Sequence, residues 1–508
     1  MPDAQQGSGG PSAQEGRGAS VELTVGVGPM AHGGHCVARH EGRVVFVRHA
    51  VPGETVRVRI DDPQPGAKFW RGDVIEVLER SEHRRRHIWK LADALRAHQM
   101  GRPPVGGAEY GHMTDQHQRW IKAHVFRDTL QRVGGISVHD LASGRSLIDG
   151  ELHVRDVGDR AEDGVHWRTR VSFAVDDAGA LCMKPHRSHE LIELRGMPLA
   201  VPAVNGSGLF GADFTGARTV DLIAPGGEGP LALVVRPAES GPAAESGPQL
   251  QGLRDRLDSM ARRDERVGTV LLAEQSPDGG RAGRRGRRGG RPQRGRATTA
   301  SQAGTEERFE LLSGPRTVTE PLPTAPEPPY GAGVLSLRPE SFWQIHRSAP
   351  EALVRTVDEM CPLDGGESVA DLYAGAGLFT AWAAARTGET GRVLSVEAAG
   401  PSAASAAERF GDHSRITLRR SPVEHVLGDL AGQDVVVLDP PRAGAGPQVI
   451  AGVDEAAPRR IVYVSCDPAS FARDAAGLMR RGWRFVDLRV LDLYPNTHHM
   501  ESVAVFAR

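Results

Sequence analysis

Three short, largely apolar runs in the last third of the chain each lead directly into a polar or glycine-rich segment. They are residues 369–373 before Ala374-Gly375-Ala376-Gly377, residues 435–438 before Asp439-Pro440-Pro441-Arg442, and residues 461–464 before Ser465-Cys466-Asp467-Pro468. Apolar runs of this length are typical of strands that are buried on both faces, as in a parallel sheet. Because ligands bind at the carboxyl ends of such strands, the three segments predict one active-site crevice.

The same region alternates between expected strands and expected helices. The strands are 368–372, 393–397, 416–419, 435–438, 461–464, 485–491 and 503–506, and the helices include 378–386, 401–409 and 470–480. From about residue 331 to 508, this alternation predicts an α/β domain with a doubly wound, Rossmann-like sheet that ends in an antiparallel hairpin.

The chain has 508 residues, more than one hydrophobic core usually organises, so two or three domains are expected. Its four cysteines are scattered, which fits a reducing compartment better than a disulfide framework. The N-terminus lacks the pattern of a secretory signal, and no apolar run approaches the length that spans a bilayer. We therefore expect a cytoplasmic protein with no membrane partner, and nothing in the sequence indicates an obligate protein partner.

The part of the chain before residue 331 predicts two further domains. Residues 1–18 are rich in Gly, Ser and Gln and are expected to form a disordered tail. From 19 to 80, short alternating strands are separated by glycine turns, which predicts a small closed barrel of the OB type. Residues 81–330 are expected to form a central α+β domain, with a helix at 114–132 and a strand at 166–175.

Residues from about 239 to 307 are rich in Gly, Pro, Ser and Gln and are expected to be a disordered insertion in the central domain. The insertion contains an arginine and glycine tract at 281–296, although the net charge of the whole chain is only −2. Such a tract cannot bury an apolar face and stays strongly cationic. It is either a solvated insertion without a role or a non-specific arm that binds nucleic-acid phosphates.

The glycine-rich segment after residue 373 and the acidic residue that ends the next strand indicate a nucleotide-like cofactor. Gly375 and Gly377 let the backbone approach a ligand closely, and Glu397 is placed to accept hydrogen bonds from ribose hydroxyls. The same pattern occurs in NAD enzymes. Here the G-x-G-x-x-G spacing of the dinucleotide fingerprint is absent, and the segment from Asp371 to Phe379 resembles that of S-adenosylmethionine methyltransferases.

Taken together, the motifs closely resemble those of the RNA 5-methyluridine methyltransferase family. In chain order they are Ser341-Phe342-Trp343-Gln344, the segment 371–379, Val396-Glu397, Asp439-Pro440-Pro441-Arg442, Ser465-Cys466-Asp467-Pro468 with Ala472-Arg473-Asp474, and His498-His499-Met500-Glu501-Ser502-Val503. The N-terminal barrel resembles a TRAM domain, an RNA-binding module, through Gly33-Gly34, Val37-Ala38-Arg39, residues 44–47 and Pro52-Gly53-Glu54. The resemblance implies methyl transfer from S-adenosylmethionine to C5 of a uridine in tRNA or ribosomal RNA.

This chemistry requires a nucleophile and a base. C5 of uracil is too weak a nucleophile until a thiolate has added to C6, and the resemblance assigns that role to Cys466. After transfer, a base must remove the C5 proton so that the thiolate can leave, and the resemblance assigns Glu501 to that step. It also implies four residues that bind S-adenosylmethionine: Gln344, Tyr373, Glu397 and Asp439.

The chain departs from the family in one respect. Many members hold an iron–sulfur cluster with four cysteines, but this chain has Gly106 to Met113 and Gly196 to Leu199 at those places, so no cluster is expected. His112 and His117 lie five residues apart, yet a third ligand is not evident, so no metal site is predicted.

Two alternatives stay open at this point. The first is an RNA-binding protein that retains an inactive methyltransferase domain, against which the presence of both Cys466 and Glu501 argues. The second is a methyltransferase for exocyclic amines of nucleic acids, which would use Asp439-Pro440-Pro441. Those enzymes carry an aromatic residue after the prolines and need no nucleophile, so Arg442 and Cys466 disfavour them.

Overall fold

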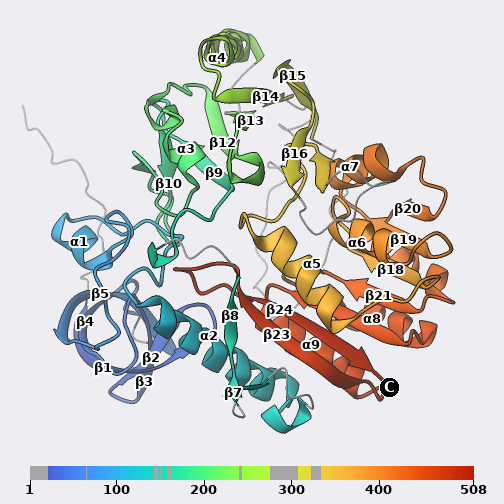
Figure 1. Cartoon of the computed structure of the whole chain (residues 1–508). Coiled ribbons are helices and arrows are strands. Elements are labelled where there is room, and N and C mark those ends of the chain that lie inside the picture. The colour runs from blue at the N-terminus through green and yellow to red at the C-terminus, as the bar shows by residue number, and fades with distance from the viewer. Residues whose placement is uncertain are drawn as a thin grey trace, which may run out of the picture.

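A computed structural model of the chain describes residues 21–64, 66–141, 147–148, 151–157, 162–238, 243–274, 307–321 and 333–508. Three bodies surround a common centre: an N-terminal barrel, a seven-stranded sheet and an eight-stranded sheet (Figure 1). The predicted tail at 1–18 and the tract at 281–296 lie outside the described residues. None of the helices in the described ranges combines the length and the apolar character that crossing a bilayer requires.

The N-terminal barrel confirms the predicted OB-like fold. Five strands close in the order β1-β2-β3-β5-β4, with bounds β1 Glu22–Ala31, β2 His35–His40, β3 Arg43–Arg48, β4 Thr55–Ile60 and β5 Phe69–Glu79. Alternate side chains point inward, so Val45, Val58 and Val74 are fully buried. Gly72 has to be glycine, since a Cβ there would clash with the carbonyl oxygen of Arg59 on the neighbouring strand.

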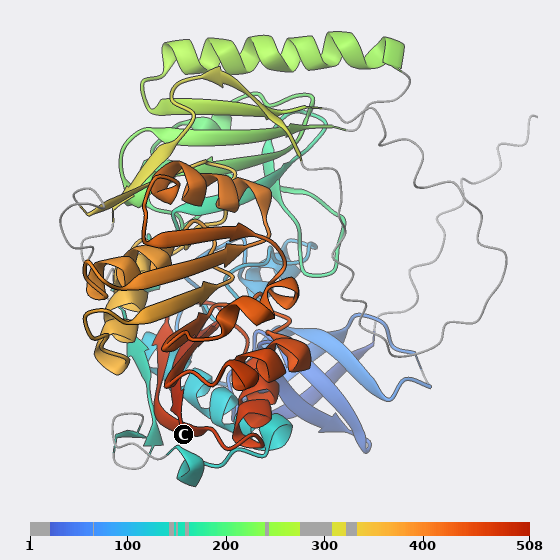
Figure 2. The ribbon, with the colours of Figure 1, turned by 90° about the vertical axis from the view of Figure 1, so that its right-hand side faces the viewer.

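The seven-stranded sheet has the order β11-β10-β9-β12-β13-β14-β15. Its bounds are β9 Arg170–Val175, β10 Leu181–Met183, β11 Ile192–Glu193, β12 Ala217–Ile223, β13 Leu231–Pro237, β14 Val267–Ala273 and β15 Phe309–Ser313. Helix α4 (Ala243–Arg263) lies across one face of this sheet (Figure 2). Short helix α3 (Pro202–Asn205) and the hairpin of β16 (Val318–Pro321) with β17 (Val334–Leu337) flank it, whereas helix α1 (Ala94–Gln99) packs against β5 of the barrel.

The prediction of one disordered insertion over 239–307 is wrong for residues 243–274. Leu253 and Leu257 of α4 lie one turn apart, are fully buried, and pack in the same core as β14. The Val/Leu-rich strand β14 then pairs with β13 and β15. The apolar residues of α4 and β14 recur at the spacing of a helix and of a strand. This pattern decides their structure, although the segments around them are rich in Gly and Pro.

The eight-stranded sheet confirms the predicted doubly wound arrangement with a terminal hairpin. Its order is β20-β19-β18-β21-β22-β24-β23-β8, with β18 Ser368–Leu372, β19 Arg392–Glu397, β20 Ile416–Arg420, β21 Val435–Leu438, β22 Arg460–Ser465, β23 Arg484–Asp492, β24 Glu501–Ala507 and β8 Val154–Asp156. The first five strands are parallel, and β24 is antiparallel to both of its neighbours. Its helices are α5 Ala349–Met360, α6 Leu378–Arg386, α7 Gly400–Phe410, α8 Gly446–Ala456 and α9 Pro468–Met479.

Part of the predicted central domain belongs to the body formed by the eight-stranded sheet. Strand β8 pairs with β23 at the edge of the sheet, beyond the short hairpin of β6 (Leu147–Ile148) and β7 (Glu151–Leu152). Helix α2 (Asp115–Thr129) packs against α9, where the rings of Phe126 and Phe471 lie 5.8 Å apart. The predicted range 81–330 is therefore not one structural unit, because its first part completes the core of the eight-stranded sheet.

Candidate active site

Cys466 occupies the junction between strand β22 and helix α9. The strand ends at Ser465, and the Asp467 carboxylate caps α9 by accepting hydrogen bonds from the N–H groups of Ala469 (3.0 Å) and Ser470 (2.8 Å). Burial would raise the pKa of Asp467, but hydrogen bonds from His32 and Ser470 lower it to about 2. The thiol is thus held at the carboxyl end of a buried strand, as the sequence predicted.

Glu501 lies beside Cys466 because of the register between two strands. Ser465 of β22 pairs with Ser502 of β24, so the next positions along this antiparallel pair are Cys466 and Glu501. Glu501 is only 3% exposed. The Tyr494 hydroxyl donates a hydrogen bond to Glu501 Oε2 (3.1 Å), and Oε1 has no partner among the described residues.

The electrostatics of this pair favour the uncharged forms in the free protein. Burial raises the pKa of the Cys466 thiol to about 12, and the carboxylates of Glu501 and Asp439 add to the effect. Burial also raises the pKa of Glu501 well above its usual value, assisted by Asp439 and opposed by Tyr494 and Arg442. The carboxylate of Glu501 therefore disfavours ionisation of the Cys466 thiol.

Two further carboxyl groups stand at the ends of β18 and β21. Burial raises the pKa of Asp439 to about 7, with added repulsion from Asp371 and Glu397. Burial likewise raises the pKa of Asp371 to about 7, although the Thr380 hydroxyl donates to its Oδ2 at 2.6 Å. Asp371 Oδ1 is buried without a partner in the described part of the chain. The crevice is therefore an acidic, desolvated site that would favour a cationic ligand.

Glu397 is fixed by the backbone around it. Its Oε2 accepts from the N–H of Gly375 (2.8 Å), and its Oε1 accepts from the N–H of Ala399 (2.6 Å). At Gly375 the backbone φ is +58°, and a Cβ would meet nothing within 4 Å, so open space lies in front of this turn. Tyr373 also has a positive φ, of 62°, which is unfavourable for a tyrosine and is held by the turn.

The structure brings five of the six predicted site residues to the ends of neighbouring strands. Cys466, Glu501, Asp439 and Glu397 act on one another electrostatically, and Tyr373 follows β18 directly. Gln344 is buried at 9% exposure on the segment between β17 and α5, next to the buried Trp343. That the Gln344 side chain reaches the crevice stays a prediction.

Sequence reasoning missed Tyr494, which holds Glu501, and the buried pair beneath it. Lys122 of α2 is fully buried and donates to Asp492 Oδ1 (2.6 Å) and to the carbonyl oxygen of Tyr494 (3.0 Å). This pair ties α2 to the end of β23 and to the segment after it, where Tyr494 contacts Glu501. The local sequence Asp492-Leu493-Tyr494 gives no sign of it, because its partner lies 370 residues away.

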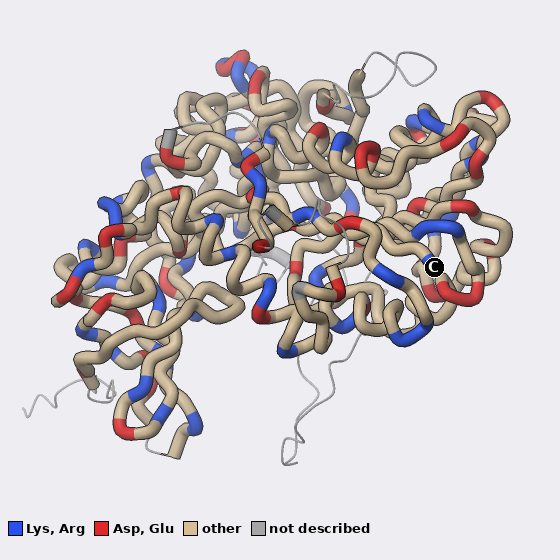
Figure 3. Tube along the Cα trace, turned by 60° about the horizontal axis from the view of Figure 1, so that its bottom comes forward, with Lys and Arg blue, Asp and Glu red and all other residues tan. Residues whose placement is uncertain are grey.

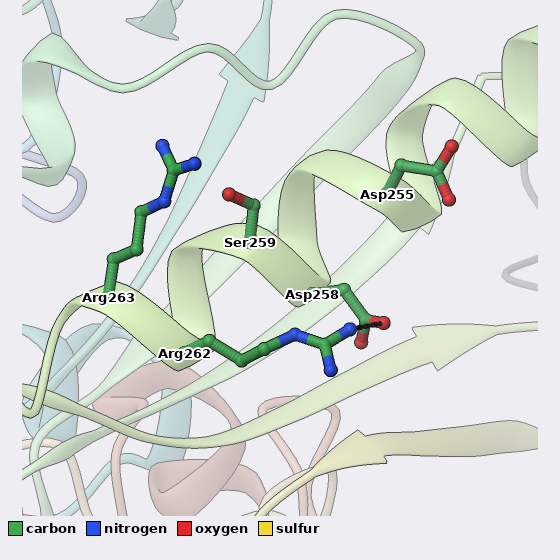
Figure 4. Close-up of a pocket in the computed structure, with 5 residues that line it drawn as sticks. All are labelled: Asp255, Asp258, Ser259, Arg262 and Arg263. Atoms are coloured by element: carbon green, nitrogen blue, oxygen red, sulfur yellow. Dashed lines mark hydrogen bonds and ion pairs between the residues drawn. The ribbon is translucent and has the colours of Figure 1, made fainter.

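Other polar features are separate from the crevice. His112 Nε2 lies 3.3 Å from the carbonyl oxygen of Ala50, whereas His117 stacks on His83 at 3.9 Å, so they do not converge. Within the described ranges, no group of three or more His, Cys, Asp or Glu side chains is arranged to hold a metal ion. A shallow pocket on α4 (Figure 4) is lined by Asp255, Asp258, Ser259, Arg262 and Arg263. It contains no residue of the crevice.

Comparison with known proteins agrees with this architecture. A model of the TRAM domain matches residues 20–75, and a model described as tRNA (Uracil-5-)-methyltransferase matches residues 424–508. An uncharacterized RNA methyltransferase of Streptomyces avermitilis is 32% identical over 95% of this chain and 98% of its own length. One from Streptomyces coelicolor is 33% identical over 95% and 92%. The chain belongs to this RNA methyltransferase family.

A solved structure shares the fold of the methyltransferase over almost its whole length. The tRNA (uracil-54, C5)-methyltransferase of Pyrococcus abyssi, in complex with S-adenosyl-L-homocysteine, aligns with a TM-score of 0.60 at 18% identity, covering 95% of this chain and 100% of that one. The chain is thus an RNA methyltransferase, and its residues 424–508 match the tRNA (Uracil-5-)-methyltransferase model. The crevice has room for a cationic cofactor such as S-adenosylmethionine, since open space lies in front of Gly375 and the buried Asp371 Oδ1 has no partner in the described part of the chain.

Proposed function

We propose that the methyltransferase methylates C5 of a uridine in a folded tRNA or ribosomal RNA, with Cys466 as nucleophile and Glu501 as base. The observation that carries the proposal is the β22–β24 register, which puts the only partly exposed cysteine beside a buried carboxyl group at the carboxyl end of the sheet. The other three cysteines are buried, in agreement with a structural role.

The reaction begins at C6 of the base. The Cys466 thiolate forms a bond to C6, and the electron pair of the C5–C6 double bond moves toward C5 and O4. S-adenosylmethionine supplies an electrophilic methyl group on a sulfonium. When it is bound, C5 would form a bond to that methyl carbon while the sulfur–methyl bond breaks, and the sulfur would keep that electron pair and leave as a neutral thioether.

Glu501 completes the turnover. Its Oε1 removes the proton from C5, the C5–C6 double bond forms again, and the bond between C6 and Cys466 breaks. The raised pKa of Glu501 fits this order of events. While Cys466 carries a negative charge, it repels ionisation of Glu501, and this repulsion disappears once the sulfur is bonded to C6.

Tyr494 acts as a positioning residue for this step. Its hydroxyl holds Glu501 Oε2, which leaves Oε1 for the C5 proton. The buried Lys122–Asp492 pair holds the backbone of Tyr494 in turn. Hydrogen bonding from Tyr494 also stabilises the carboxylate form of Glu501.

We assign the cofactor to Gln344, Tyr373, Glu397 and Asp439. Glu397 is oriented by two backbone N–H groups and so can accept hydrogen bonds from ribose hydroxyls in one fixed position. Asp439 stands between the cofactor side and Cys466. The barrel is assigned to RNA binding, and the reaction is assigned to the cytoplasm.

Nucleoside mass spectrometry tests this function directly. RNA from cells that lack the protein is incubated with the purified enzyme and S-adenosylmethionine carrying a labelled methyl group. We expect labelled 5-methyluridine at a single mapped position in tRNA or ribosomal RNA. Label in another nucleoside, such as a methylated exocyclic amine, or no label in any cellular RNA would overturn the proposal.

A further inference from the structure

The outer face of the barrel carries an aromatic and cationic cluster formed by Phe46, Phe69 and Arg71. Phe46 of β3 pairs directly with Arg71 of β5, and Phe69 stands two positions before Arg71 on the same face. The two phenyl rings lie edge to face with centroids 5.4 Å apart. The Arg71 guanidinium lies 4.5 Å from the Phe69 ring centroid and 6.0 Å from that of Phe46.

Folding of the barrel does not explain why Phe69 is on this face. The core of the barrel lies on the opposite side of these strands, where Val45, Val47 and Val74 are fully buried. Phe69 keeps 39% of its surface exposed. An exposed phenyl ring next to a guanidinium plane is the surface on which an unpaired nucleobase stacks, because every base has a π-face.

Two neighbouring residues, Gly34 in the turn before β2 and His35 of β2, connect the cluster to the segment that precedes strand β24. His35 borders the Phe46 ring at 6.2 Å. The residue before it, Gly34, has a φ of +78° and packs so closely on His498 that a Cβ would come within 3.0 Å of it. His498 stands three residues before Glu501. A nucleotide on the cluster would therefore lie beside the segment that carries the proposed base.

Positive charge at the cluster favours an anionic backbone. Arg187, on the exposed loop after β10, faces Arg71, and burial together with the positive charge of Arg187 lowers the pKa of Arg71. Asp61 opposes this effect. His186, the residue before Arg187, lies 6.2 Å from His35, so the seven-stranded body also borders the cluster. A phosphate between Arg71 and Arg187 would relieve their repulsion.

Charges of both signs occur throughout the molecule. Along the Cα trace of the described residues, Lys and Arg positions are interspersed with Asp and Glu positions (Figure 3). Phosphate attraction over the whole protein therefore does not single out a path for RNA. The combination of an exposed phenyl ring with the neighbouring Arg71 guanidinium distinguishes this face of the barrel.

We propose that Phe46, Phe69 and Arg71 form a stacking site for one unpaired nucleotide of the RNA substrate, with its phosphate near Arg71 and Arg187. The proposal rests on the proposed function only in taking RNA as the substrate. Stacking does not read hydrogen-bonding edges, so the site tolerates any base. Its role is to hold the strand that flanks the target uridine.

The test uses the full-length protein and a 12-nucleotide single-stranded RNA that carries one 2-aminopurine. The dissociation constant and the fluorescence quenching of 2-aminopurine are measured for wild type, Phe69→Ala, Phe69→Tyr and Arg71→Lys. Leu78→Ala is the matched control, because Leu78 is an apolar residue of the same strand that is 46% exposed.

We expect Phe69→Ala to weaken binding by about 5- to 100-fold and to abolish the quenching, as removal of one stacked base predicts. Phe69→Tyr keeps the ring and should match wild type. Arg71→Lys keeps the positive charge but loses the planar guanidinium group. It should therefore reduce the quenching more than the affinity. Equal affinity and quenching for Phe69→Ala and Leu78→Ala would overturn the proposal.

Two precautions keep the result decisive. If Phe69→Ala unfolds, Arg71→Lys decides, since it keeps the positive charge and changes only the planar head group: unchanged quenching overturns the site. Binding is read without S-adenosylmethionine and without turnover, so its outcome is independent of which atom is methylated. Normal binding by Phe69→Ala together with 5-methyluridine formation by wild type would reject the stacking site and leave the proposed function intact.

Discussion

The catalytic crevice and the outer face of the barrel differ in how far their ionisable side chains are buried and in the sign of their charge. In the crevice, Asp371, Asp439, Glu501 and Cys466 are held where burial favours their neutral forms. On the barrel, the Arg71 guanidinium lies over an exposed ring. Proton transfer and thiol addition gain from exclusion of water, whereas holding a long polyanion requires an open surface. Chemistry and RNA binding are thus assigned to separate bodies that meet at Gly34 and His498.

The largest effect is expected at the nucleophile. Cys466→Ala should reduce methyl transfer by about 10³-fold or more while changing S-adenosylmethionine affinity by less than about twofold, because the thiol acts on the base alone. Labelled methyl transfer and calorimetric titration measure the two quantities. A variant that loses cofactor affinity to the same extent as activity would place Cys466 in the cofactor site instead.

Glu501→Gln should stop the reaction after the methyl group has been transferred. The amide cannot accept the C5 proton, so the Cys466–C6 bond should persist and turnover should fall by roughly 10²- to 10⁴-fold. Denaturing electrophoresis with labelled RNA would show a protein–RNA band that wild type lacks. Normal multiple turnover by this variant would show that another group is the base.

The next largest effect should be on the free energy of unfolding, which should depend more on a buried ion pair near the crevice than on an exposed ion pair of the barrel. Lys122 and Asp492 are buried beneath the crevice, so Lys122→Met should destabilise the protein by roughly 3–5 kcal/mol by leaving Asp492 buried and unpaired. The matched control is Arg57→Met in the barrel, where Arg57 and Glu76 pair at 2.9 Å but both stay exposed. It should cost less than about 1 kcal/mol. Urea denaturation compares the variants, and similar losses of stability for both would contradict the contrast in burial.

Tyr494→Phe should have a moderate and pH-dependent effect. Without the hydroxyl, the carboxylate of Glu501 loses a stabilising hydrogen bond, so its already raised pKa should rise further. The carboxylate of Glu501 is the form that accepts the proton. In a plot of the rate of adduct breakdown against pH, the fall toward acidic pH should therefore begin at a higher pH than in wild type. At neutral pH, breakdown should slow by about tenfold. A uniform fall at every pH would indicate a packing role for Tyr494 instead.

The smallest effect concerns the arginine and glycine tract at 281–296. Its deletion should weaken RNA binding at low salt and flatten the salt dependence, with a slope reduced by roughly 0.7 to 0.9 for each phosphate that the protein no longer neutralises. The methylated position should not change. If position mapping showed a different uridine, the tract would select the target rather than add affinity.

The parts of the fold that the sequence predicted are those in which burial repeats at a fixed interval. Buried parallel strands such as β21 and β22 are unbroken apolar runs, so their ends were predicted to within one residue, and the regular alternation of the barrel strands predicted a closed barrel. Helix α4 was not predicted because its apolar stripe is short and lies between segments rich in Gly, Pro and Arg.

The residues of the site also fall into those that a sequence pattern predicts and those that it does not. Cys466 and Asp439 follow strands directly and Glu397 ends one, so sequence order alone places them at one edge of the sheet. The hydrogen bond from Tyr494 to Glu501 depends on the turn between β23 and β24, and the ion pair of Lys122 with Asp492 depends on how α2 packs. Contacts between distant segments have no local sequence pattern, so they could not be predicted.

The central claim is that Cys466 attacks C6 of a uridine, and trapping tests it most directly. Wild type is incubated with S-adenosylmethionine and a substrate RNA in which 5-fluorouridine replaces uridine, since a base cannot remove fluorine as a proton. After digestion, mass spectrometry should find one peptide with Cys466 joined to a methylated 5-fluorouridine, and Cys466→Ala should give no adduct. An RNA that is methylated normally but yields no adduct, or an adduct on another residue, would contradict the claim.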